Sequence, residues 1–246
     1  DVWVQSEHLK YYDRTDKEYR RAVNLMQRKF CKLKYADLKQ LYEVSEQANR
    51  EPFWYMRSRA EDIYMSKNVS HKVVCQFLHE QIGSHTEIKK IITQCYIILE
   101  RVVPKKNTLC LVGPPNSGKT WFIDMLAAFY VNVGHVANFV RGDHFPLNDC
   151  VNRRVLVWNE PSICPSAFET VKMLLGGDVC PANIKYENHS VIVRTPVLMS
   201  TNVRVLSDDT VWTVRVRTYW WQASDILKSV SKRPNPETWI ELVKLL

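Results

Sequence analysis

The first part of the chain carries apolar residues at helical spacing between many charged and polar ones. These apolar residues are Ala22, Leu25, Met26, Phe30, Leu38, Leu41 and Tyr42. The stretch from residue 1 to about 70 is rich in Lys, Arg, Glu and Tyr and has no glycine. It predicts several short amphipathic helices with a break near Pro52. Their apolar stripes fit two alternatives, because periodicity does not show which surface a stripe covers. One is a helical collar that packs on its own core, and the other is an oligomerisation module that meets a neighbouring subunit.

Further along, the pattern changes to alternating strands and helices. Residues 72–103 predict two more helices, with a turn near Gly83 and an end before Pro104. Beyond them, five apolar runs predict strands at 109–112, 137–140, 155–158, 196–200 and 214–220. Helices are expected at 121–130, 166–175 and 236–246. Strands alternating with helices favour an α/β fold, in which a mostly parallel sheet is flanked by helices.

A glycine-rich loop lies between the first predicted strand and the helix that follows it. Its residues are Gly113, Pro114, Pro115, Asn116, Ser117, Gly118, Lys119 and Thr120. The glycines let backbone N–H groups approach phosphate oxygens, and the helix directs its positive end at the same oxygens. Lys119 adds a charge between the β- and γ-phosphates, and the Thr120 hydroxyl can bind Mg²⁺. The strand-loop-helix context therefore predicts a phosphate loop that binds ATP and Mg²⁺.

Two further strands end in polar residues that belong at the same edge of the sheet. Glu160 follows the run 155–159, where ligands of open α/β sheets bind, and can hold the Mg²⁺ shell and polarise an attacking water. Asn202 ends the run 196–201 and could sense the γ-phosphate, although a strand-ending Asn is more often a turn former. A ring-shaped ATPase also needs a cation from the neighbouring subunit. Arg215 is the first choice for it and Arg217 the second.

Residues 179–193 alternate enough to predict a β-hairpin. Its tip carries Lys185, Tyr186 and His189. A positive side chain can contact the phosphates of single-stranded DNA, and an aromatic ring can stack on a base, so this tip would suit binding of single-stranded DNA. The alternative is an ordinary exposed polar loop.

Composition restricts the class of partner and the kind of site only moderately. The net charge is +8, from 34 basic and 26 acidic residues, which fits a polyanionic partner. Seven scattered cysteines without a C-x-x-C pair make a zinc site or a disulfide framework unlikely. No apolar run is long enough to cross a bilayer, so no membrane partner is expected. The first residue is Asp1, which suggests a piece of a longer protein.

Taken in order, these elements resemble superfamily 3 helicases of the AAA+ class. Residues 113–120, 155–160, 172–185 and 196–202 are similar to motifs A, B, B′ and C. The likeness is greatest to the large non-structural, Rep-like replication proteins of parvoviruses, densoviruses among them. It covers residues 105 to 222 and implies a division into a helical oligomerisation region, 1–103, and an AAA+ helicase domain, 104–246. The resemblance implies an ATP- and Mg²⁺-dependent 3′–5′ DNA helicase of viral replication in the host cell nucleus. It would form a hexamer-like ring with ATP between subunits.

The resemblance also assigns roles by motif position. Lys119 and Thr120 become the nucleotide and metal contacts, and Glu160 the acidic catalyst. Lys185, Asn202 and Arg215 become the DNA contact, the polar sensor and the arginine finger.

Two residues depart from the family pattern. Pro161 and Asn183 stand where many relatives have acids. The metal-binding His motif of the family's DNA-nicking domain is not found, so DNA cutting is not expected. The competing hypothesis is an NTP-dependent switch or genome-packaging module that does not unwind DNA.

Overall fold

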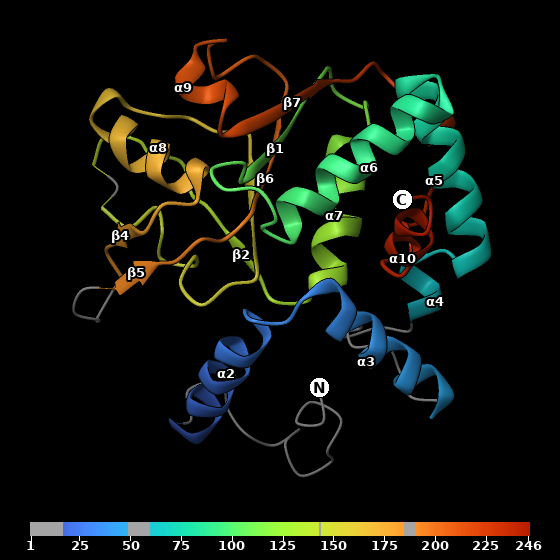
Figure 1. Cartoon of the computed structure of the whole chain (residues 1–246), viewed down its shortest axis with the longest axis horizontal. Coiled ribbons are helices and arrows are strands. Elements are labelled where there is room, and N and C mark those ends of the chain that lie inside the picture. Colours follow the sequence, from blue (N-terminus) through green and yellow to red (C-terminus); the bar gives the residue numbers. More distant parts are fainter. Residues whose placement is uncertain (1–16, 49–59, 143, 185–189) are drawn as a thin grey trace.

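The computed structural model describes residues 17–48, 60–142, 144–184 and 190–246 (Figure 1). Two short 3₁₀ helices, Pro165–Ala167 and Ile226–Ser229, accompany the main elements. In chain order the main elements are α2 (Lys17–Phe30), α3 (Tyr35–Gln47), α4 (Ala60–Ile63), α5 (Lys67–Ile82), α6 (His85–Leu99), β1 (Thr108–Val112), α7 (Lys119–Tyr130), β2 (Val133–His135), β3 (Val155–Asn159), α8 (Phe168–Gly176), β4 (Cys180–Ala182), β5 (Ser190–Ile192), β6 (Val197–Thr201), α9 (Thr210–Thr213), β7 (Val216–Trp220) and α10 (Thr238–Val243).

Five strands form the central sheet in the order β2-β3-β6-β1-β7. All neighbouring pairs are parallel, and Thr108 of β1 lies opposite Val197 of β6 and Val216 of β7. Every residue of β1 and β6 is buried, as expected for strands covered on both faces. The predicted five-stranded parallel α/β sheet is therefore confirmed. Since parallel strands end at one edge, the residues that follow β1, β3 and β6 meet there.

The predicted strand at 137–140 is wrong. The edge strand is β2, which pairs with β3, and Phe139 contributes only an isolated bridge to Ile163. β2 is short and contains Gly134, where a Cβ atom would lie 2.3 Å from the carbonyl oxygen of Asp149. Phe139 is buried by packing against Trp158 instead of by strand pairing. The apolar pattern therefore located the buried segment around Phe139 but not β2, the segment that pairs with β3.

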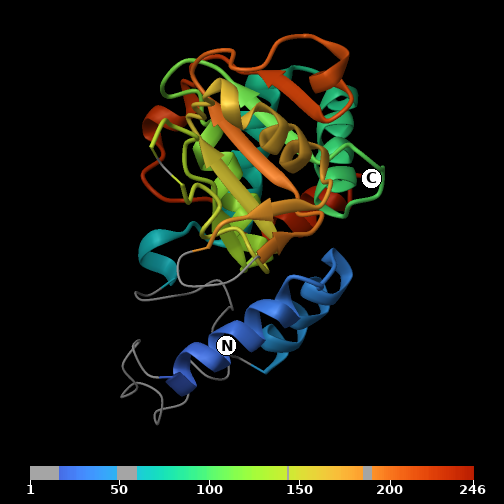
Figure 2. The same cartoon turned by 90° about the vertical axis from the view of Figure 1, so that its left-hand side faces the viewer.

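Two hydrophobic cores cover the two faces of the sheet. One joins α3, α5, α6, α7 and α10 with β1, and the other joins α8 and the β4–β5 pair with the opposite face (Figures 1 and 2). The first core includes helices from both sides of the predicted boundary at 103–104. The helical region and the sheet region thus share one core.

Of the several short amphipathic helices predicted near the N-terminus, α2 and α3 are present in the described residues, and their apolar stripes differ in burial. In α3, Leu38 and Tyr42 are buried, and the Tyr42 hydroxyl donates to the carbonyl oxygen of Phe129 at 2.7 Å. This stripe packs on its own chain, as the collar alternative requires. In α2 no residue is buried. The predicted break near Pro52 lies outside the described residues.

A buried ion pair ties the helical region to the sheet. Arg154, just before β3, donates to Glu100 Oε1 at 2.5 Å and to the carbonyl oxygens of Leu33 and Leu99 at 2.6 and 2.7 Å. Its guanidinium lies over the Tyr130 ring at 4.3 Å, and the Tyr130 hydroxyl donates to the same carboxylate at 2.8 Å. Arg154 therefore links the turn between α2 and α3, the end of α6 and the end of α7 at the start of the strand that leads to Glu160.

All seven cysteines are free thiols, and four of them are buried. Among the described residues there is no His, Cys, Asp or Glu cluster suited to a metal ion. No helix in the described ranges combines the length and apolarity that crossing a bilayer requires.

Candidate nucleotide site

The phosphate loop connects β1 to α7 in a conformation that its sequence favours. Asn116 and Gly118 have positive φ angles of 62° and 80°, which Asn and Gly adopt more readily than other residues. A Cβ atom on Gly113 would lie 2.3 Å from the backbone oxygen of Trp221. One on Gly118 would lie 2.6 Å from the Phe77 ring. The two glycines are thus required where the loop packs against the strand end and α5.

Lys119 begins α7 and directs its ammonium group back into the loop. Only 6% of the residue is exposed. Its Nζ donates to the carbonyl oxygens of Gly113 and Pro114 at 2.7 and 2.9 Å, and to Ser117 Oγ at 3.0 Å. Burial lowers the pKa of Lys119, and the negative charge of Glu160 opposes that shift. A buried cation surrounded by neutral oxygens suits an anion, so the loop fits a phosphate group.

Asn202 joins Lys119 to Glu160. Its Oδ1 accepts from Lys119 Nζ at 3.1 Å, and its backbone N–H donates to Glu160 Oε2 at 3.1 Å. Thr201 Oγ1 lies 3.5 Å from the same carboxylate oxygen. The three residues come from the ends of neighbouring strands and the start of α7, so the sheet edge brings together Lys119, Glu160 and Asn202 as predicted.

Two oxygen ligands for Mg²⁺ are available beside the loop. Thr120 and Glu160 are both exposed at this edge. Hydroxyl and carboxylate oxygens are hard ligands of the kind that Mg²⁺ prefers. The residues present therefore fit a metal-bound nucleoside triphosphate.

Asn138 holds the chain on both sides of Glu160, and the sequence did not reveal this role. Its Oδ1 accepts from Trp158 Nε1 and from the backbone N–H of Ser162, each at 3.0 Å. Glu160 has a positive φ of 46° and precedes Pro161, which is an unfavourable backbone for an ordinary residue. Asn138 thus bridges the strand and the loop around a strained carboxylate residue.

Residues 224–226 pack between the phosphate loop and α5, a contact that no sequence pattern indicated. The Ser224 N–H donates to the carbonyl oxygen of Asn116 in the phosphate loop at 3.0 Å. Glu80 on α5 accepts from the N–H groups of Asp225 and Ile226 at 2.7 and 3.3 Å, and from the Ser224 hydroxyl. The loop is therefore fixed to α5 through this segment.

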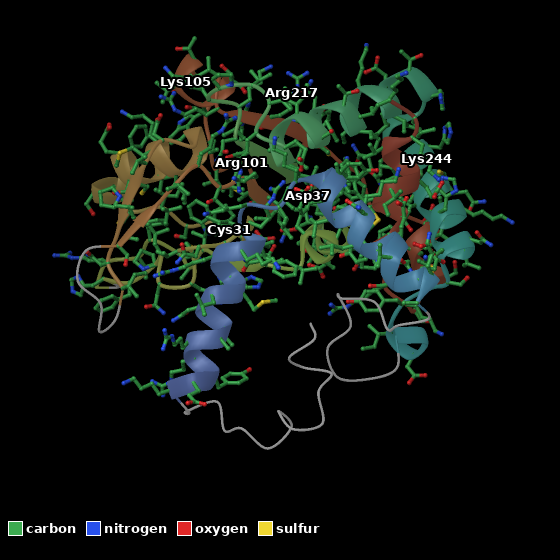
Figure 3. The ribbon with its side chains drawn as sticks, turned by 60° about the horizontal axis from the view of Figure 1, so that its bottom comes forward. Cys31, Asp37, Arg101, Lys105, Arg217 and Lys244 are labelled. Atoms are coloured by element: carbon green, nitrogen blue, oxygen red, sulfur yellow. The ribbon has the colours of Figure 1, made fainter. Side chains whose placement is uncertain are left out.

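Arg215 lies at the opposite edge of the sheet from the phosphate loop. It precedes β7, and its carbonyl oxygen accepts from the N–H of Thr108 at the start of β1. Its Nη1 donates to the carbonyl oxygen of Val211 at 2.6 Å. Arg217 is exposed on β7 opposite Leu109, near the start of β1, whereas the phosphate loop follows the end of β1 (Figure 3). Neither arginine reaches the site of its own chain, so a role in hydrolysis requires a second copy.

The predicted hairpin is present as the antiparallel pair β4 and β5. Its tip, with Lys185, Tyr186 and His189, lies outside the described residues. The expected DNA contacts therefore stay predictions.

Comparison with known proteins gives a consistent assignment. The family model for parvovirus non-structural protein NS1 matches residues 18–216. The initiator protein NS1 of Bombyx mori densovirus is 39% identical over 155 residues, which are 63% of this chain and 17% of that protein. The initiator protein NS1 of Junonia coenia densovirus is 31% identical over 176 residues, 71% of this chain and 32% of that protein. Protein Rep52 of adeno-associated virus 2 is 33% identical over 101 residues, 41% of this chain and 25% of that protein.

The chain spans less than a third of the length of these densovirus relatives. Among solved structures, the X-ray structure of JCV helicase is similar, with a TM-score of 0.62 and 14% identity. The match covers 98% of this chain and 70% of that one, and it shows the same fold. The chain thus belongs to the parvovirus non-structural protein NS1 family.

Proposed function

We propose that this chain is the ATP-hydrolysing motor of a viral replication protein, an Mg²⁺-dependent DNA helicase that moves 3′ to 5′. The observation that carries the proposal is the continuous contact from Lys119 through Asn202 to Glu160 at the edge of the sheet. It places a phosphate-binding cation and a carboxylate in one site, as hydrolysis of a triphosphate requires. The initiator names of the densovirus relatives and the helicase fold support the same conclusion.

Each residue then has a defined task. Backbone N–H groups at the start of α7 and the Lys119 ammonium bind the phosphates and take up negative charge. Glu160 orients the attacking water and accepts its proton, while the Asn202 N–H holds the carboxylate in place. Thr120 and Glu160 would hold Mg²⁺, which supplies charge neutralisation at the phosphates when bound.

The remaining parts of the proposal concern assembly and location. Chains would form a hexamer-like ring in which Arg215 enters the site of the next subunit. The hairpin tip with Lys185, Tyr186 and His189 would grip single-stranded DNA. The work would take place in the host cell nucleus, where viral DNA is replicated.

The direct test measures ATP hydrolysis with and without single-stranded DNA, and strand separation on duplexes with either a 3′ or a 5′ tail. Hydrolysis should be stimulated by single strands, and only the duplex that loads the motor for 3′–5′ movement should open. Lys119→Ala removes the charge at the phosphates and should eliminate both activities. An unchanged hydrolysis rate in this variant would place the site elsewhere.

Lys185→Ala separates the motor from the alternative of a switch or packaging module. For a motor, the variant should lose unwinding and keep basal hydrolysis. Hydrolysis by the unmodified chain without unwinding, over a range of salt and oligomeric states, would favour the switch.

A further inference from the structure

The positive charge of this chain is concentrated in one short segment. Residues 17–34 contain seven Lys and Arg against one Glu, and so carry +6 of the chain's net charge of +8. The other 228 residues together carry +2. The sheet and its helices are therefore almost balanced, and the basic character belongs to α2 and the turn that follows it.

Three of the five Lys and Arg residues of α2 form a stripe on one side of the helix. Lys17, Arg21 and Arg28 project within about 40° of one another and extend over about 16 Å of its length, given the geometry of an α-helix. All three are exposed, and within the described residues none of them forms an ion pair. These three residues are called the basic stripe below.

The opposite side of α2 differs in chemistry and in contacts. Its partly buried residues are Tyr19, Ala22, Val23, Met26, Gln27 and Phe30. Phe30 packs against the core, and the carbonyl oxygen of Gln27 accepts from Asn132 Nδ2 at 3.0 Å. The helix therefore turns its apolar side inward and leaves the basic stripe on the surface.

Two arginines, one after α6 and one before β3, hold the segment that follows α2. The carbonyl oxygen of Cys31 accepts from Arg101 Nη2 at 3.2 Å, and that of Leu33 accepts from Arg154 Nε at 2.6 Å (Figure 3). Figures 1 and 2 show α2 outside the central sheet and its covering helices. It lies on the side of the molecule where β5 is also found. The basic stripe is thus held at the end of the molecule that carries the hairpin.

We propose that the basic stripe of α2 binds the phosphate backbone of double-stranded DNA, independently of base sequence. Clustered Lys and Arg on one face of a helix are typical of contacts to nucleic-acid phosphates. The aromatic residues of α2, Tyr19 and Phe30, lie on its inward side, so the stripe offers no ring for an unpaired base. Duplex DNA also has twice the charge per unit length of one strand. The inference rests on the proposed function, because it gives the motor a separate contact for the duplex.

The test compares two triple variants of the whole chain in binding to a blunt duplex oligonucleotide, without nucleotide. The first variant is Lys17→Gln, Arg21→Gln and Arg28→Gln. The control, Lys72→Gln, Lys89→Gln and Lys244→Gln, removes three exposed charges from α5, from α6 and from the residue that follows α10, where Lys244 pairs with Glu241. Circular dichroism and basal ATP hydrolysis are measured on both, and both should equal the unmodified chain because neither triple touches the nucleotide site.

The stripe variant should bind the duplex at least 10-fold more weakly at about 100 mM salt. The slope of log affinity against log salt should fall by about 2 to 3, the value for three lost phosphate contacts. The control should change affinity by less than about 2-fold, since its charges lie away from α2.

Several outcomes would overturn the proposal. Equal losses in both variants would mean that total charge, and not the stripe, sets the affinity. A loss confined to single-stranded DNA would assign the stripe to the unwound strand. Stronger binding to phosphatidylserine vesicles than to duplex, lost in the stripe variant, would assign it to a membrane surface. Because basal ATP hydrolysis is measured in the same samples, failure of the motor itself would be seen separately.

Discussion

At the scale of single residues, the site depends on how Glu160 is held. Its positive φ and the following proline both disfavour the observed backbone. Two anchors compensate for this. The Asn202 N–H binds the carboxylate, and Asn138 binds the chain before and after it. A carboxylate that must direct one water gains from such support, because small displacements reduce catalysis strongly.

Replacing Asn138 should therefore slow hydrolysis without weakening nucleotide binding. Asn138→Leu removes the acceptor of Trp158 Nε1 and the Ser162 N–H, so kcat should fall by about 10- to 100-fold. The KM for ATP should stay within about 2-fold, since the phosphate loop is untouched. Asn138→Asp keeps an acceptor oxygen and should recover most of the rate. Equal loss in both variants, or a raised KM, would contradict a positioning role.

At the scale of elements, the buried Arg154–Glu100 pair joins the helical region to β3. Both side chains are nearly inaccessible, and each has further partners in α3, α6 or α7. Removing one member of such a pair leaves an uncompensated buried charge, whereas removing both does not. Substitutions of Arg154 and Glu100 should therefore have strongly coupled effects on the free energy of unfolding.

Arg154→Met should lower the free energy of unfolding by about 3 to 5 kcal/mol, because the Glu100 carboxylate stays buried without its cation. Adding Glu100→Gln should recover part of the loss, since the Tyr130 hydroxyl can still donate to the amide oxygen. Chemical denaturation of the two single variants and the double variant gives the coupling. Strictly additive effects would show that the pair does not act as a unit.

Elements were predictable to the extent that local pattern determines them. The phosphate loop, β1, β3 and β6 could be identified because apolar runs lead directly into polar residues with a specific chemistry. β2 could not, because a three-residue edge strand with a glycine has no hydrophobic period. Asn138, Arg154 and Glu80 were also missed, since each acts on residues that only the folded chain brings close.

At the scale of the whole molecule, Lys119 is the one Lys or Arg that contacts Asn202, the partner of the Glu160 carboxylate, among the residues that the structure describes. Arg215 lies at the far edge of its own sheet, with Val211 as a hydrogen-bond partner. A ring would bring that edge to the phosphate loop of the next subunit, since heterologous contacts close head to tail. The second copy would then be part of the site, and hydrolysis would depend on assembly.

Under this arrangement Arg215→Ala should reduce hydrolysis by about 10³-fold, whereas Arg217→Ala, two residues further along in β7, should change it by less than about 2-fold. Arg215 also contacts its own chain, so a structural loss must be separated from a catalytic one. Mixing Arg215→Ala with inactive Glu160→Gln subunits does so. In an equal mixture about one quarter of interfaces combine an intact Glu160 with an intact Arg215 from the neighbour, and activity should reappear in that proportion. Activity that stays absent at every mixing ratio would mean that Arg215 does not serve the adjacent subunit's site.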